Sequence, residues 1–212
     1  MKFLITSGGT VEPIDAVRVL TNISSGHTGA VLATYLLQKN HDVTLLRSIH
    51  AEPVPKTENI VFDSFKSLDA ALRALLAHEN FDVIIHAAAV SDFTVDKISQ
   101  QGKEISVADQ QKIKSGLPLV LYLKPTFKVI DRLLQYASNR PTVVGFKLTS
   151  GANPDQVKEA VLKVKADWVV HNDMTDIRAR RRIFTIYQQG TAKKHLSSVE
   201  ELAAWLSDLH KV

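Results

Sequence analysis

Two glycine- and hydroxyl-rich segments near the start of the chain have the composition of an anion-binding site. Ser7-Gly8-Gly9-Thr10 follows a short apolar run, and Ser24-Ser25-Gly26 comes just before an amphipathic stretch. Backbone N–H groups at the start of a helix point toward the same place as the positive end of the helix dipole, so such a segment can bind a phosphate or a carboxylate. A helix cap combined with a tight turn would use the same residues, and spacing alone does not separate the two interpretations. The glycines match neither the dinucleotide fingerprint GxGxxG nor the P-loop GxxxxGK(S/T).

Small side chains and a carboxylate follow a later apolar run. Ala87, Ala88 and Ala89 come at its end, and Asp92 is three residues further on. At the carboxyl end of a parallel strand, small residues let a ligand lie against the bare backbone. Close packing of a helix over the strand end would need the same small residues. We interpret His86, inside the apolar run, as a core residue with a hydrogen-bond partner, because no carboxylate or second histidine is spaced to complete a metal site with it.

Two groups of basic residues have the charge to bind polyanions. Lys112 and Lys114 are two residues apart, so an extended backbone places both ammonium groups on one side, where they suit a polyphosphate and the charge of departing pyrophosphate. A solvated loop is the alternative. The densest cluster runs from Arg178 to Arg182. Because it has neither interleaved aromatic residues nor a recognition-helix pattern, it indicates a solvated strand edge, and we expect no nucleic-acid partner.

Short apolar runs alternate with amphipathic stretches along the chain, and the strands and helices that they predict would position the candidate site segments. Six runs are rich in Val, Ile and Leu on both alternating faces, which predicts buried strands at 2–6, 42–46, 82–87, 118–123, 142–146 and 167–170. Four stretches place apolar residues at helical spacing, which predicts helices at 28–38, 67–78, 128–137 and 154–163. The alternation predicts an α/β fold with a mostly parallel sheet and helices on both faces.

Two regions depart from this alternation. Near the end of the chain, residues 182–187 and 191–195 predict a hairpin, and Ser198 with Glu201 predicts a capping box at the start of a last helix. Residues 96–116 are polar and show no clear period. About twenty such residues within a compact domain are uncommon, and they predict a mobile flap.

The composition of the chain excludes several other classes of protein. The chain has 212 residues, of which 45% are hydrophobic and 23% charged, and this balance excludes disordered and collagen-like chains. We expect a single domain over residues 1–212. The absence of cysteine excludes disulfides, thiolate zinc sites and a cysteine nucleophile, and the net charge of +4 fits an anionic small molecule. With neither a signal-peptide core nor an apolar stretch of membrane-spanning length, the sequence predicts a cytoplasmic protein with no membrane partner.

Five ordered motifs resemble those of one enzyme family. The chain reads TSGGTVEPIDAVRVLTNISSGHTG over residues 6–29, HAAAVSDF over 86–93, KIKSG over 112–116, VGFK over 144–147 and ADWVVHND over 166–173. Together these motifs resemble phosphopantothenate–cysteine ligase, also called phosphopantothenoylcysteine synthetase, of coenzyme A biosynthesis. Because the sequence has no room for the flavin-dependent decarboxylase domain that is often fused in front, it resembles the free-standing bacterial form.

The resemblance implies a Rossmann-like ligase that activates the carboxylate of 4′-phosphopantothenate with a nucleoside triphosphate and Mg2+. Pyrophosphate leaves, an acyl-nucleotide forms, and the amine of L-cysteine then displaces the nucleoside monophosphate. By their positions in the motifs, Asn22 holds the activated acyl group and Lys114 is the flap lysine of the activation step. The other residues implied to contact substrate or nucleotide are Gly8, Gly9, Thr10, Arg18, Ser24, Ser25, Gly26, Ala87, Ala88, Ala89, Asp92, Lys112, Lys128 and Phe146. The resemblance leaves open whether Lys163 or Lys165 contacts a phosphate, and it assigns no residue to the metal.

The resemblance also implies a nucleotide and an assembly. The opening motif is closer to the bacterial branch, which uses CTP, whereas GFKLTS at 145–150 is closer to the eukaryotic branch, which can use ATP. We expect CTP. Members of the family are generally dimeric, and the flap and loops look too polar to close a site alone, so we expect a homodimer. The alternatives are a short-chain NAD(P)-dependent reductase, although the sequence lacks the Tyr-x-x-x-Lys pair, and a non-catalytic nucleotide-binding protein.

Overall fold

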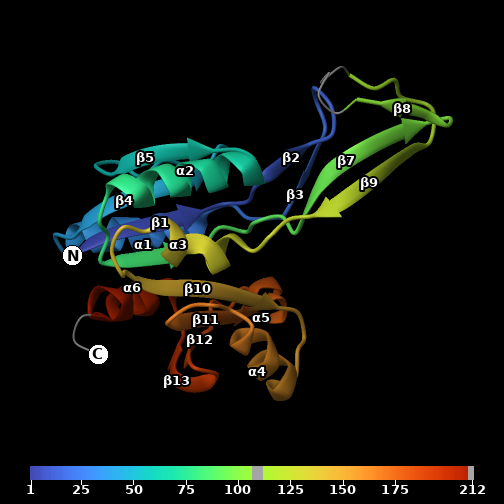
Figure 1. The fold of residues 1–212 in the computed structure, drawn as a ribbon. Coiled ribbons are helices and arrows are strands. Elements are labelled where there is room, and N and C mark those ends of the chain that lie inside the picture. Colours follow the sequence, from blue (N-terminus) through green and yellow to red (C-terminus); the bar gives the residue numbers. More distant parts are fainter. Residues whose placement is uncertain (107–111, 210–212) are drawn as a thin grey trace.

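The computed structural model describes residues 1–106 and 112–209, which form a body of helices and strands with an arm of strands projecting from it (Figure 1). The body is built on an eight-stranded sheet of β1 (Lys2–Ser7), β4 (Asp42–Ser48), β5 (Glu58–Phe62), β6 (Val83–His86), β10 (Thr142–Thr149), β11 (Trp168–Asp173), β12 (Phe184–Gln188) and β13 (Thr191–Leu196). The strand order is β13-β12-β11-β10-β6-β1-β4-β5. Neighbours from β5 to β11 are parallel, whereas the pairings that involve β12 are antiparallel.

The chain starts in the middle of this sheet, and that start determines where a ligand can bind. From β1 it proceeds outward to β4 and β5, and it then returns to place β6 on the other side of β1. The direction of winding therefore reverses between β1 and β6. In an open parallel sheet, such a switch point leaves a crevice at the carboxyl ends of the two strands.

Helices cover both faces of the sheet. They are α1 (His27–Gln38), α2 (Phe65–His78), the 3-10 helix η1 (Val129–Arg132), α3 (Leu133–Tyr136), α4 (Pro154–Leu162), α5 (Met174–Arg178) and α6 (Val199–Ser207). Successive residues of β1 point to opposite faces, so Phe3 packs in one core cluster with Leu32 of α1 and Leu202 of α6, while Leu4 packs in another with Leu72 of α2. The predicted α/β fold, including the C-terminal hairpin and helix, is confirmed.

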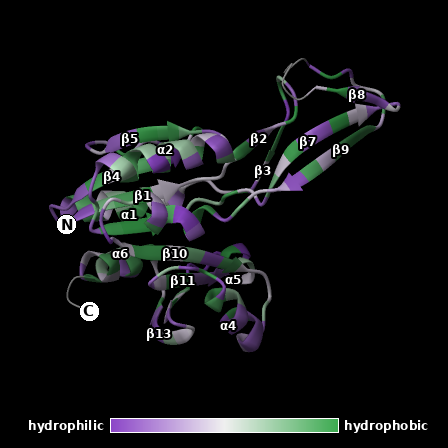
Figure 2. Cartoon of the chain, viewed as in Figure 1, coloured by the Kyte–Doolittle hydropathy of each residue, from purple (hydrophilic) through white to green (hydrophobic). Residues whose placement is uncertain are grey.

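The arm consists of a three-stranded antiparallel sheet and a short hairpin. The sheet has the order β8-β7-β9, with β7 (Phe93–Gln100), β8 (Lys103–Ile105) and β9 (Leu119–Pro125), and the hairpin is β2 (Val11–Pro13) with β3 (Val19–Thr21). Hydrophilic and hydrophobic bands alternate along β7 and β9 (Figure 2). This alternation is typical of antiparallel strands that are solvated on one face.

The arm corrects two sequence predictions. The run at 118–123 is a strand, but it belongs to the separate sheet of the arm and not to the parallel sheet of the body. Part of the predicted flap at 96–116 is regular, because residues 96–100 lie in β7 and residues 103–105 form β8. The polarity of those residues reflects a small solvated sheet. The mobility of the flap stays a prediction, and residues 107–111 lie outside the described residues.

Two helix predictions also change in detail. The stretch predicted as one helix at 128–137 is a single turn of 3-10 helix followed by the short α3. Ser198 caps α6, since its Oγ accepts a hydrogen bond from the Glu201 N–H at 3.1 Å, but the Glu201 carboxylate accepts from Ser197 N at 2.7 Å instead of from Ser198 N. The predicted capping box is therefore displaced by one residue. Among the helices of residues 1–106 and 112–209, none has the length and apolar character needed to cross a membrane.

Candidate functional site

The carboxyl ends of β1 and β6 continue as a pair beyond the sheet and form the back wall of the site. Ala89 N donates to Gly8 O at 2.8 Å, and Thr10 N donates to Ala89 O at 3.2 Å. Gly8 has a φ of +87°, and a Cβ there would lie 2.5 Å from Ser48 Cβ, so the tight turn requires glycine. Three residues of this segment are buried and line neither of the two cavities described below: Gly8, Gly9 and Thr10. The segment therefore supports the back wall from behind, and its contact with a ligand stays a prediction.

One cavity, of about 400 Å3, opens at the start of α1 and is named here the α1 cavity. It brings together segments that are far apart in the sequence, namely Ser24, Ser25, Gly26, Ala87, Ala88, Ala89, Phe146, Asn172 and Arg182. Gly26 begins the helix in the left-handed region with φ 77° and has no side chain to cap it, while Ser25 Oγ accepts a hydrogen bond from the His27 N–H at 3.4 Å. The first residues of the helix, His27 to Gly29, line the cavity, so the cavity lies at the positive end of the helix dipole, as an anion site requires.

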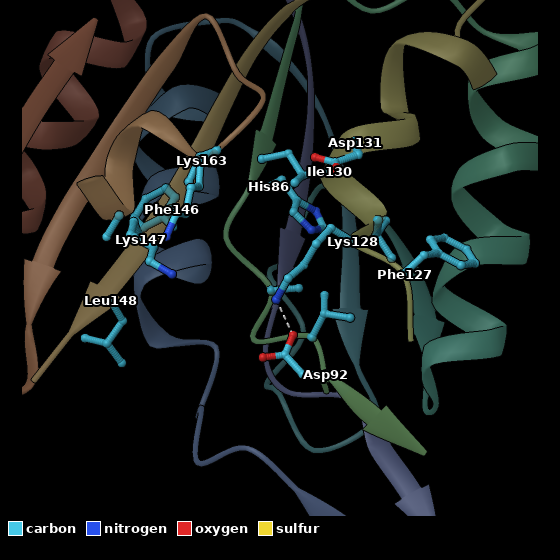
Figure 3. Close-up of a pocket in the computed structure, with 15 residues that line it drawn as sticks. His86, Asp92, Phe127, Lys128, Ile130, Asp131, Phe146, Lys147, Leu148 and Lys163 are labelled. Atoms are coloured by element: carbon cyan, nitrogen blue, oxygen red, sulfur yellow. Dashed lines mark hydrogen bonds and ion pairs between the residues drawn. The ribbon is translucent and has the colours of Figure 1, made fainter. Parts of the chain in front are cut away.

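A second cavity, of about 330 Å3, lies beside the end of β6 and is named the β6 cavity. Ala88 and Phe146 line both cavities, so the two adjoin. In Figure 3, Phe146 and Lys147 of β10 lie with Lys163 on one side of the β6 cavity, while Lys128 lies opposite and is paired with Asp92. Lys147 makes no side-chain hydrogen bond or ion pair within residues 1–106 and 112–209, which leaves its ammonium group available to an anion.

Lys163 and Lys165, between which the resemblance did not choose a phosphate contact, lie in different surroundings. Lys163 lines the β6 cavity, where its Nζ bonds Glu159 Oε1 at 2.6 Å. Lys165 does not line that cavity, and its Nζ lies 3.6 Å from an oxygen of Asp131. Lys163 is therefore the one of the two that borders the β6 cavity.

His86 lies at the base of the β6 cavity and is buried. Its Nδ1 lies 2.9 Å from Thr6 Oγ1, and the same hydroxyl oxygen accepts the N–H of Ala88 at 3.2 Å. Burial lowers the pKa of His86 from 6.5 to about 4, so the ring is neutral near pH 7. The interpretation of His86 as a core residue with a hydrogen-bond partner is confirmed. Its place in the cavity wall was not predicted.

Acidification is expected to destabilise the protein through His86. Because its pKa is lowered in the folded state, the unfolded chain binds the proton more tightly, so stability present above pH 6.5 is lost as the pH falls toward 4. The full shift corresponds to about 3 kcal/mol. Urea unfolding of the wild-type chain and of His86→Gln, measured at several pH values from 7 to 4, checks this. We expect the wild type to lose more stability than the variant, and parallel curves would remove His86 as the cause.

Asn22 lies between the arm and the body. It follows β3, and its Nδ2 donates to Val90 O at 3.2 Å, which ties the segment before α1 to the segment after β6. Its side chain is exposed, and the next residue, Ile23, lines the α1 cavity. The structure thus brings Asn22 to the edge of the site without placing it in the cavity lining.

Arg18, Lys112 and Lys114 lie on the arm, and none of them lines either cavity. The tip of the β2–β3 hairpin binds both backbone polar groups of Ile113: the Ile113 N–H donates to Asp15 Oδ2 at 3.0 Å, and Arg18 Nη1 donates to Ile113 O at 3.3 Å. Hydrogen bonds from backbone N–H groups, first that of Val17, lower the pKa of Asp15. Arg18 therefore fixes the segment that carries the two lysines, and its contact with a ligand stays a prediction.

The described residues of the site include few metal-binding side chains. Among the described residues, no cluster of three or more His, Cys, Asp or Glu side chains could hold a metal ion. Asp92 and Asp131 are the carboxylates of the β6 cavity. Mg2+ is usually bound by one or two carboxylates together with ligand phosphates, and two carboxylates in this cavity fit such a donor set.

The mostly parallel sheet, with helices on both faces and adjoining cavities at its switch point, defines a Rossmann-like domain. A family model for the DNA/pantothenate metabolism flavoprotein C-terminal domain matches residues 1–209, and the chain belongs to this family.

Individual relatives agree with the family match. The chain is 34% identical over 199 residues to the coenzyme A biosynthesis bifunctional protein CoaBC of Thermococcus kodakarensis, covering 91% of this chain but 46% of that protein. A DNA/pantothenate metabolism flavoprotein from Streptococcus pneumoniae superposes with a TM-score of 0.84 at 29% identity, covering 100% of this chain and 98% of that one. A Cab2 complex with phosphopantothenate-cysteine shares the fold, with a TM-score of 0.70 at 17% identity over 98% of this chain and 86% of that chain. The chain thus spans about half the length of the CoaBC relative.

Proposed function

We propose that this chain is a phosphopantothenate–cysteine ligase, which joins 4′-phosphopantothenate to L-cysteine at the expense of a nucleoside triphosphate. The family match and the coenzyme A biosynthesis relative support this, and the related Cab2 fold holds phosphopantothenate-cysteine. The single observation that carries the proposal is the pair of adjoining cavities at the switch point of the sheet. A reaction between a nucleotide and an acyl substrate needs two ligand sites that meet.

In the proposed reaction, the substrate carboxylate attacks the α-phosphorus of the triphosphate, the bond from that phosphorus to the bridging oxygen breaks, and pyrophosphate leaves. The amine of L-cysteine then attacks the acyl carbon and loses a proton, and the nucleoside monophosphate leaves. We assign the base and ribose to the β6 cavity, where Phe146 offers a ring and Lys147 and Lys163 offer positive charge. We assign the reacting anionic groups to the α1 cavity, at the start of the helix. Mg2+ bound to the triphosphate would neutralise phosphate charge, and the carboxylates of the β6 cavity that could bind it are Asp92 and Asp131, which are paired with Lys128 and Lys165.

The ligation itself is tested by mass spectrometry of the product. The purified chain is incubated with 4′-phosphopantothenate, L-cysteine, triphosphate and Mg2+, and each component is omitted in turn. We expect the amide only in the complete mixture. Triphosphate binding without amide in that mixture would favour the non-catalytic alternative and overturn the proposal.

We expect CTP to be the preferred nucleotide. Ala88 and Phe146 border both cavities, so the base and the reacting groups would meet beside them, and a purine needs the width of an additional ring. A site whose backbone groups pair with a pyrimidine leaves them unpaired when the wrong base binds, which can cost several powers of ten in kcat/KM. Pyrophosphate release with CTP and ATP at equal concentration checks this. An ATP rate equal to or above the CTP rate would reverse the assignment.

We also propose that the chain forms a homodimer through its arm. β9 is an edge strand, and the arm exposes Val120 and Tyr122 on the same face, at 50% and 53%. Apolar side chains on an open edge favour pairing with a second copy. Sedimentation at micromolar concentration is expected to give a dimer for the wild type and a larger monomer fraction for Tyr122→Lys. A wild-type chain that is fully active as a monomer would contradict the proposal.

A further inference from the structure

A third cavity, of about 500 Å3, lies beside the α1 cavity and is named the arginine cavity. Arg180, Arg181 and Arg182 line it, together with the first turn of α6. His27 and Arg182 also line the α1 cavity, so the two cavities share a wall. A ligand in the α1 cavity therefore lies next to a concentration of positive charge that the proposed reaction does not use.

The backbone after α5 holds these arginines in a fixed turn. The N–H of Arg180 donates to Ile177 O at 3.0 Å and that of Arg181 donates to Asp176 O at 2.9 Å. Arg180 adopts a φ of 58°, in the left-handed region that residues with a Cβ rarely occupy. The turn therefore fixes the backbone of Arg180 and Arg181 at the edge of the arginine cavity.

The charges of the turn are not balanced by the protein. Arg181 is paired, because its Nε and Nη2 bond Asp176 Oδ1 at 3.1 and 2.6 Å. Arg180 and Arg182 make no side-chain hydrogen bond or ion pair within the part of the chain that the structure describes, and both are exposed. Glu200 is the carboxylate among the residues that line the arginine cavity, so the lining keeps a net positive charge. Neighbouring guanidinium groups repel each other, and a bound anion removes that repulsion.

We propose that Arg180 and Arg182 form an anion subsite, next to the proposed acyl-substrate site, that binds a phosphate monoester or pyrophosphate. Guanidinium groups offer paired N–H donors that match two phosphate oxygens, and they stay charged at every physiological pH. Two molecules of the proposed reaction could supply this anion. One is the phosphate end of the acyl substrate, and the other is free pyrophosphate held after it leaves. The subsite adjoins the site of the proposed function, but its anion binding does not depend on that function.

Titration calorimetry with inorganic pyrophosphate as the probe, at fixed ionic strength and without nucleotide, tests the subsite on the full chain. We compare the wild type with the Arg180→Gln, Arg182→Gln double variant. Arg178→Gln is the matched control, since Arg178 belongs to the same basic cluster but lines neither cavity. We expect about a tenfold or greater rise in Kd for the double variant and none for the control, because hydrogen bonds to charged groups are among the strong ones. Equal binding by the double variant, or no binding by the wild type, overturns the proposal.

Steady-state kinetics of the same variants then distinguish the two sources. A higher KM for 4′-phosphopantothenate, with the KM for the triphosphate unchanged, identifies the phosphate end of the substrate. Unchanged KM values with weaker inhibition by pyrophosphate identify the released product. Unchanged KM values together with unchanged inhibition would overturn the subsite. A wild-type chain that binds pyrophosphate through these arginines but forms no amide would instead contradict the proposed function and leave the subsite supported.

Discussion

Replacing Asn22 with alanine is expected to lower kcat by about 10²–10³, the usual cost of losing one well-placed donor to developing negative charge. The resemblance implies that Asn22 holds the acyl group, and we propose that its amide donates to the acyl oxygen when the cysteine amine attacks. The side chain is exposed at the edge of the site, where its described hydrogen bond is the one to Val90 O. Its loss should therefore affect the rate far more than the free energy of unfolding. The measurement is amide formation under saturating substrates, combined with urea unfolding.

The matched control for this substitution is Asn80→Ala. Asn80 is an exposed asparagine on the turn before β6, and its Oδ1 accepts a hydrogen bond from Ser138 Oγ. This variant should keep wild-type kcat. Wild-type turnover in Asn22→Ala would remove Asn22 from the site.

Lys114→Gln is expected to lower the rate of pyrophosphate release by a similar factor of about 10²–10³, because we propose that its ammonium group neutralises charge that develops as pyrophosphate departs. The backbone of this lysine is held, since Lys114 O accepts from Gln100 Nε2 at 3.2 Å and the adjacent Ile113 is bound by Asp15. Glutamine keeps most of the side-chain length and removes the charge. Single-turnover release of pyrophosphate isolates this step from the attack by cysteine.

Lys103→Gln is the control for charge on the same arm. Lys103 is an exposed residue of β8 and makes no side-chain hydrogen bond or ion pair with the described residues. Its replacement removes one positive charge from the arm and should leave pyrophosphate release unchanged. An equal loss in both variants would indicate a general effect of arm charge, and an unchanged rate in Lys114→Gln would remove that lysine from the activation step.

The body of the fold was predictable because buried parallel strands are nearly continuous apolar runs. Residues 42–46 show this, because Val43 and Leu45 pack in the core cluster on one face of the sheet and Leu46 packs in the cluster on the other face. Helices cover both faces of the strand. The run at 118–123 has the same composition, but a run does not reveal which strand it pairs with, and β9 pairs with β7 in the arm. Strands of three residues, such as β2 and β3, are too short to show a period.

The sequence predicted the site residues that lie at the ends of buried strands, but it did not predict those whose position depends on contacts between loops. Ala87 to Ala89 follow β6, and Phe146 of the neighbouring strand β10 comes directly after Gly145, the residue paired with His86 at the end of β6, so the parallel sheet brings them together. The recessed position of Gly8 depends on its pairing with Ala89, which spacing along the chain does not encode. Arg182 and Lys147 had no signal beyond their charge. The arginine cluster, interpreted from the sequence as a solvated edge, is exposed but also borders the α1 cavity.

The proposed reaction breaks the bond between the α-phosphorus of the triphosphate and its bridging oxygen. The purified chain, 4′-phosphopantothenate, Mg2+ and CTP are mixed without cysteine, and the nucleotide products are separated. We predict pyrophosphate in an amount close to that of the enzyme, with an acyl-nucleotide retained on it, followed by CMP and the amide when L-cysteine is added. Release of CDP with inorganic phosphate would show activation through an acyl phosphate and would contradict the proposed mechanism.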